Sequence, residues 1–176
     1  LTLKNTLLYS ESILCLDNSY VNVQVLWIYL PEFILTIGSL ILLFYIIYKY
    51  NINSSYSYIF NSIKISFFTL ALTFISLIFQ FSILTLNDQL FIVYNNWYLI
   101  DLFTTSLKLI LSIFSIFYLL TIILFVNKMN KKNWNPEYFL FILFIILASF
   151  GLISSSNWLF LFILIEIIGA CSLFLI

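Results

Sequence analysis

Hydrophobic residues gather in five long runs that are separated by polar segments. A helix needs about 20 apolar residues to cross a hydrocarbon core of roughly 30 Å, and each run is close to that length. We therefore expect an all-α fold, a polytopic membrane bundle of five transmembrane helices. The pattern predicts a polar tail and interfacial segment over 1–29, then a membrane domain over 30–176 with helices at about 30–48, 63–86, 100–126, 137–153 and 157–176.

Two of these helices carry clear start signals. Pro31 and Glu32 open the first, where a missing N–H is harmless and an acid faces the positive end of the helix dipole. The fourth begins in the same way with Asn135-Pro136-Glu137. These signals predict helix boundaries, and they also give Glu32 a structural explanation.

Polar residues on the second and third predicted helices recur at spacings of three and four, which places each set on one helical face. The second helix carries Ser66, Thr69, Thr73, Ser76 and Gln80. The third carries Asp101, Thr105, Lys108, Ser112 and Ser115. We interpret the first set as a packing face, because small polar residues let membrane helices approach closely. For Lys108 two interpretations remain open: snorkelling to the interface beside an interfacial Asp101, or pairing within the bundle.

Glu166 is the residue for which a functional role is most strongly expected. It lies in the middle of the fifth run, with nine residues of that run before it and ten after. A central acid costs roughly 2.5–3.5 kcal/mol on insertion scales, and at mid-depth its short side chain does not reach water. Glu166 must therefore be protonated, paired or hydrated, or else hydrogen-bonded to a neighbouring helix in a structural role. Gly169 and Ala170 share its face, which suggests a surface that receives another helix.

Composition narrows the class of protein. The chain is 64% hydrophobic and 8% charged, with a net charge of zero and neither Arg nor His, so nucleic acid is not an expected partner. Cys15 and Cys171 suggest neither a disulfide nor a metal site. The abundant Phe, Ile, Leu, Tyr, Asn and Ser are residues of AT-rich codons, and residues 1–24 do not resemble an import signal. We expect synthesis inside an organelle.

Lysine placement predicts the topology. Lys49 and Lys64 flank one loop, and a second loop on the same side of the bundle holds Lys128, Lys131 and Lys132. By the positive-inside rule, the amino terminus faces out and the carboxyl terminus faces in.

Several of these motifs resemble subunit 2 of NADH dehydrogenase, an antiporter-like membrane subunit of respiratory complex I. The resemblance covers about 30–176. Its motifs are Leu30-Pro31-Glu32-Phe33-Ile34-Leu35 with Gly38-Ser39-Leu40, then Asp101-Leu102-Phe103 with Lys108, and finally Glu137-Tyr138 through Ser155, Asn157, Phe162 and Glu166. The position after Glu166 departs from the family, which often has Ser, Pro and Tyr there.

The resemblance implies a function in a proton-translocating NADH:ubiquinone oxidoreductase of the mitochondrial inner membrane, with the amino terminus in the intermembrane space and the carboxyl terminus in the matrix. Glu166 then occupies the position of the intramembrane Glu of a Glu/Lys proton relay, with Lys108 and Asp101 as weaker candidates. No cofactor and no metal are expected on this chain, which is a non-redox subunit in this interpretation.

The family's lysine-bearing later helices have no counterpart in the sequence, so the resemblance implies the first part of the antiporter-like fold, as the amino-terminal fragment of a split subunit. The expected partners are a companion fragment carrying the later helices, other complex I membrane subunits, and lipid. Two alternatives stay open: another antiporter-like transporter subunit, and a structural assembly subunit of a respiratory complex.

Overall fold

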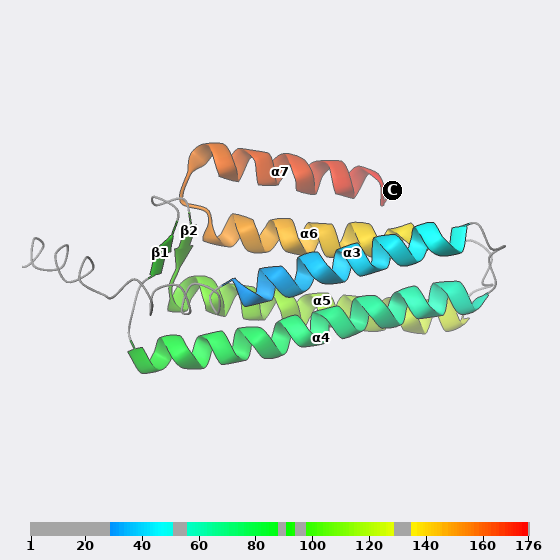
Figure 1. Ribbon diagram of the computed structural model, residues 1–176, viewed down its shortest axis with the longest axis horizontal. Coiled ribbons are helices and arrows are strands. Elements are labelled where there is room, and N and C mark those ends of the chain that lie inside the picture. The colour runs from blue at the N-terminus through cyan, green and yellow to red at the C-terminus, as the bar shows by residue number, and fades with distance from the viewer. Residues whose placement is uncertain (1–28, 51–55, 88–90, 94–97, 129–134, 176) are drawn as a thin grey trace, which may run out of the picture.

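A computed structural model describes residues 29–50, 56–87, 91–93, 98–128 and 135–175 of the chain. Within them lie five helices and one two-stranded hairpin (Figure 1). The elements in order are α3 (Leu30–Tyr50), α4 (Tyr56–Asn87), β1 (Phe91–Val93), β2 (Tyr98–Ile100), α5 (Leu102–Lys128), α6 (Glu137–Ser154) and α7 (Trp158–Leu173). The predicted tail over 1–29 lies outside the described residues except for Tyr29.

Helices α3, α4, α5 and α6 form a four-helix bundle in which neighbours along the chain run in opposite directions (Figure 1). α4 packs against α3 and α5, and α6 packs against the same two helices from the other side. Helices α3 and α5 therefore occupy opposite corners of the bundle and run parallel to each other. Helix α7 packs on the outer side of α6, and the antiparallel hairpin of β1 and β2 lies at the end of the bundle where α3, α5 and α7 begin (Figure 1).

Leucines at seven-residue spacing form much of the bundle core. Leu35 and Leu42 of α3 are fully buried, as are Leu70 and Leu77 of α4. Residues seven positions apart lie on the same side of a helix, so a seven-residue repeat places one leucine after another along the contact, or seam, between two helices. The face of α6 toward this seam is lined by Phe139, Leu143, Ile146 and Phe150.

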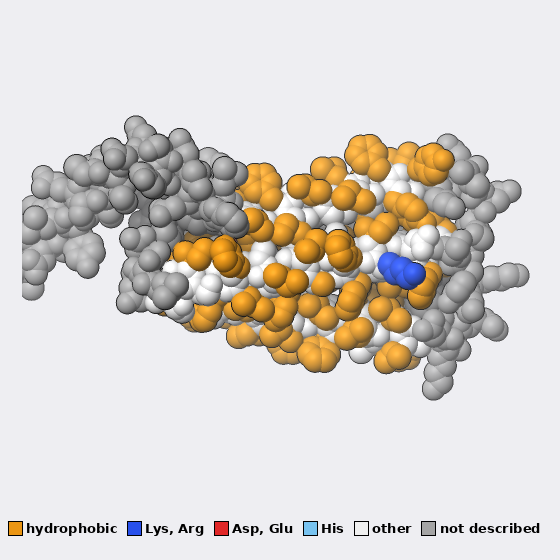
Figure 2. All heavy atoms as spheres, turned by 60° about the horizontal axis from the view of Figure 1, so that its bottom comes forward, with side chains coloured by type: hydrophobic (Ala, Val, Ile, Leu, Met, Phe, Trp, Pro, Cys, Tyr) orange, Lys and Arg blue, Asp and Glu red, His pale blue; other side chains and the backbone are white. Residues whose placement is uncertain are grey.

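The outer surface of the bundle is apolar, the reverse of a soluble protein. Large hydrophobic side chains such as Phe44, Phe68 and Phe114 are more than half exposed. Figure 2 shows hydrophobic side chains covering one long face of the bundle between its two ends. With so many apolar groups outside and polar stripes inside, the fold is that of a membrane bundle.

In the described part of the chain, four helices are long and apolar enough to cross a membrane, which confirms the prediction for those four. Their candidate spans are Leu30–Tyr48, Tyr58–Thr85, Leu102–Phe125 and Glu137–Ser154. The fifth predicted span is shorter than expected, because α7 has 16 residues and a helix of that length extends about 24 Å. The helix ends at Leu173 instead of continuing to 176.

Two features near the polar segments differ from the prediction. α4 begins at Tyr56, seven residues earlier than expected, because Tyr58 packs on Tyr45 and its hydroxyl donates to the carbonyl of Ile46 at 3.2 Å. Tertiary contacts thus continue the helix through a polar segment. The hairpin was not predicted, since each strand has only three residues and carries no measurable alternation.

Gly38 allows α3 and α4 to approach closely. A Cβ at this position would overlap the methyl group of Thr69 on α4 and would lie 2.8 Å from its Cβ. This contact is the small-residue packing that membrane helices use where their backbones come near each other.

Candidate functional site: intramembrane charges

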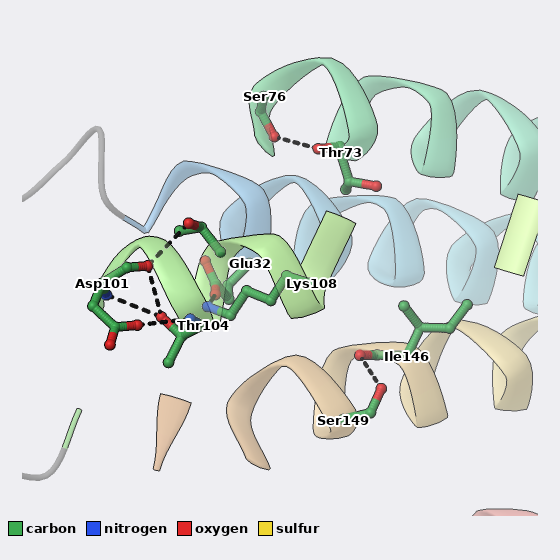
Figure 3. Close-up of polar contacts among 9 residues, drawn as sticks. Glu32, Thr73, Ser76, Asp101, Thr104, Lys108, Ile146 and Ser149 are labelled. Carbon is green, nitrogen blue, oxygen red and sulfur yellow. Dashed lines mark hydrogen bonds and ion pairs between the residues drawn. The ribbon is translucent and has the colours of Figure 1, made fainter. Parts of the chain in front are cut away.

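An ion pair lies inside the bundle and joins two helices that are not sequence neighbours. Lys108 Nζ of α5 lies 2.6 Å from Glu32 Oε1 of α3 (Figure 3). The Lys108 side chain is fully buried, whereas Glu32 is 16% exposed. At this distance the contact is a charge-assisted hydrogen bond, and it spans the diagonal of the four-helix bundle.

The positions of the two residues along their helices explain how they meet. Glu32 is the third residue of α3 and Lys108 is the seventh of α5, so the Lys108 Cα lies about 9 Å beyond the start of its helix. Side chains of helical residues lean toward the amino-terminal end. Because α3 and α5 run parallel, the long Lys108 side chain extends back toward the level of Glu32.

Lys108 therefore pairs within the bundle, as one of the two interpretations from the sequence has it, and its side chain also leans toward the hairpin end of the bundle. The missed partner was Glu32, which the sequence analysis explained by the helix dipole alone. A usable signal was present: both residues stand near the starts of helices separated by one intervening helix, which places them at the same side of the membrane.

Asp101 has a different environment and caps α5. Its Oδ1 accepts a hydrogen bond from the Thr104 amide at 2.6 Å, and the Thr104 hydroxyl accepts one from the Asp101 amide at 3.0 Å (Figure 3). This reciprocal pair is a capping box with Thr in place of the usual Glu or Gln. The carboxylate of Asp101 thus satisfies the first turn of the helix that carries Lys108.

The predicted polar faces of the second and third spans both point inward. The buried members are Ser66, Thr69, Thr73 and Gln80 on α4, and Thr105, Lys108, Ser112 and Ser115 on α5. The serine and threonine hydroxyls of the α4 face donate to the carbonyl three residues before, as Thr73 does to Leu70 at 2.8 Å. Each of these hydroxyl groups thus donates to a backbone carbonyl of its own helix and not to another helix. This supports the interpretation of this face as a surface for helix packing.

Glu166 lies on the outer surface of the protein. The buried residue of α7 is Leu164, whose methyl groups contact α6 at Gly151. Two residues later the helix has turned by about 200°, so Glu166 points away from α6, and its side chain is exposed. Gly169 shares this outward face, and a Cβ there would meet no atom within 4 Å.

The structure thus separates the three residues that the sequence analysis selected. Lys108 is buried and paired with Glu32, Asp101 caps a helix, and Glu166 lies on an edge helix facing outward. Among the described residues, no group of three His, Cys, Asp or Glu side chains lies close enough to hold a metal ion.

Comparisons with protein-family models, with curated proteins and with solved structures found no match for this chain.

Proposed function

We propose that this chain is the amino-terminal fragment of a split, antiporter-like subunit 2 of NADH:ubiquinone oxidoreductase, in the proton-translocating membrane arm of the mitochondrial enzyme. The observation that carries the proposal is the position of Glu166. It lies midway along an apolar helix at the edge of the bundle and points away from the rest of the chain. A carboxyl group in that position is suited to a partner that approaches from outside.

In this proposal Glu166 is the acid of a Glu/Lys relay, and a companion fragment supplies the lysine. The bundle's own buried lysine does not serve, because the Lys108 ammonium is bound to Glu32. Deprotonated Glu166 stabilises a lysinium on the partner helix through their mutual attraction in a medium of low dielectric constant. When the two groups separate, that stabilisation is lost and the lysine releases its proton.

The outward face of α7 supports a helix as the partner. Gly169 and Ala170 flank Glu166 on the exposed side, and neither carries a side chain that would hold a second backbone away. The other partners in this proposal are the neighbouring membrane subunits of the complex and lipid. Electron transfer, with its flavin and iron–sulfur chemistry, belongs to other subunits.

The proposed orientation follows from the lysines. Lys49 lies in the last turn of α3, Lys64 is the ninth residue of α4, and Lys128 ends α5 at the same end of the bundle. Lys108 is near the opposite end, but it is neutralised by Glu32 and adds no net charge there. The amino terminus then faces the intermembrane space and the carboxyl terminus the matrix.

The test is Glu166→Gln in the assembled complex, with proton translocation measured per quinone reduced. The amide keeps the size of the side chain and removes its charge, so we expect an intact complex that reduces quinone but moves fewer protons. Glu137→Gln is the matched control, because Glu137 is exposed in the first turn of α6, outside the middle of the span. Unchanged proton stoichiometry in the Glu166 variant contradicts the relay.

A further inference from the structure

We propose that the Glu32–Lys108 pair is a hydrated site: water reaches it from the hairpin end of the bundle and binds between the Lys108 ammonium and the hydroxyl of Ser154. The ligand is water. This site lies on α3, α5 and α6, so it is separate from the outward face of α7 and does not depend on the function proposed for Glu166.

The first observation is the state of Ser154. Its side chain is 1% exposed, and its Oγ has no hydrogen-bond partner among the described residues. The neighbouring serines behave differently, since Ser149 of α6 and Ser155, the residue after α6, both donate to the carbonyl three residues before, at 2.8 Å. Buried hydroxyl groups are satisfied either by protein groups or by bound water. Ser154 therefore requires a partner that is small and polar.

The second observation places Ser154 in the same part of the interior as the ion pair. Lys108 Nζ lies 6.0 Å from the centre of the Phe150 ring on α6. Ser154 follows Phe150 by four residues, so it lies on the same face of α6, one turn closer to the hairpin. The Lys108 side chain leans toward that same end, as its contact with Glu32 shows.

The third observation is the charge itself. Removing an ammonium and a carboxylate from water carries a large desolvation penalty, which their mutual attraction offsets only in part. Water bound beside the pair reduces this penalty. Part of the Glu32 side chain reaches the surface, although its Oε2 is buried, so water has only to pass beside this side chain to reach the pair.

The α6 side of the interior is apolar beyond the site. On α6 the face that continues inward from Ser154 consists of Phe150, Ile146, Leu143 and Phe139, all buried and apolar. These side chains offer no hydrogen bond to water. Water that reaches the pair from the hairpin end is therefore not led further into the bundle along this face of α6.

The test is the reactivity of a cysteine at Ser154 in the full chain in its native membrane. Cys15 and Cys171 are first replaced by Ser, and Ser154→Cys is then treated with a water-soluble methanethiosulfonate that does not cross membranes. Thiols react as thiolates, which require water, so we expect modification about tenfold faster than at a buried apolar position. Ala148→Cys is the matched control, because Ala148 is also 1% exposed and lies on α6 further from the hairpin.

Equal rates at the two positions overturn the proposal. If Ser154→Cys does not accumulate in the membrane, Thr104→Cys replaces it, since Thr104 is buried one turn before Lys108 at the same end. A further arm combines Ser154→Cys with Glu32→Gln and Lys108→Met. Loss of the fast modification supports the pair as the group that holds the water, and unchanged modification overturns that assignment.

Discussion

Lys108 on α5 and Glu32 on α3 form a 2.6 Å ion pair across the diagonal of the four-helix bundle. Helices at opposite corners of such a bundle share few apolar contacts, and here a charge-assisted hydrogen bond joins them directly. The pair is close to one end of the spans, where its desolvation is less severe than at mid-membrane. It therefore links two helices that the chain separates by the whole of α4.

The two members of this pair differ in what their removal leaves behind. Glu32→Leu leaves a fully buried ammonium without its carboxylate, and we expect a loss of roughly 3–5 kcal/mol in the free energy of unfolding. Lys108→Met leaves a carboxylate on a side chain that is 16% exposed and near the start of its helix, so we expect a smaller loss. The measurement is the midpoint of thermal unfolding in detergent, together with the amount of chain in the membrane.

The double variant Glu32→Leu with Lys108→Met separates an ion-pair effect from a packing effect. Replacing both charges by apolar groups of similar size is often neutral or stabilising, so we expect it to recover most of the loss. Lys64→Met is the control, because Lys64 is exposed on α4. A double variant as unstable as Glu32→Leu alone argues against the pair as the cause.

Asp101 can be tested separately for a capping role and a relay role. Asp101→Ala removes the acceptor of the Thr104 amide, and we expect a loss of roughly 0.5–2 kcal/mol in stability. Asp101→Asn keeps an acceptor oxygen and removes the charge, so it should be nearly as stable as the native chain and should translocate protons normally. Reduced proton transfer in a stable Asn variant would instead assign Asp101 to the relay.

The substitution of Gly by Ala is expected to lower the stability of the chain at Gly38 but not at Gly169. Gly38→Ala places a methyl group against Thr69 across the α3–α4 contact, and overpacking of this kind costs roughly 1–3 kcal/mol. Gly169→Ala meets open space, so the unfolding midpoint of the isolated chain should not fall. Thr69→Ala should partly restore a Gly38→Ala chain. An unchanged midpoint in Gly38→Ala contradicts the close approach of the two helices.

A bulky residue at Gly169 tests whether another helix covers Glu166. We expect Gly169→Trp to leave the bundle itself folded, because a Cβ at this position meets no atom within 4 Å and Gly169 is on the exposed side of α7. We expect the variant to remain in the membrane but to copurify less of the companion fragment after mild solubilisation. Phe114→Trp is the control on an exposed face of α5. Equal recovery of the companion in both variants removes this face of α7 from the proposed interface.

Much of the architecture follows from the sequence alone, because hydrophobic length and periodicity are local properties. The apolar runs predicted the helices, and the three-and-four spacing predicted that the polar residues of α4, among them Thr73, share one face, and likewise those of α5 with Ser112; the structure turns both faces inward. Helix-start chemistry predicted that α6 begins at Glu137. Each of these conclusions depends only on the sequence within a few helical turns of the residue concerned.

The tertiary structure decided which faces meet. Periodicity places Lys108 and Glu32 each on one face of its own helix, but it does not specify how the helices are rotated or which of them share a corner. Packing around the leucine seam sets those rotations, and it brings Lys108 to Glu32 while it turns Glu166 outward. A charge in a membrane helix signals that something must neutralise it, and only the arrangement of the helices determines what that is.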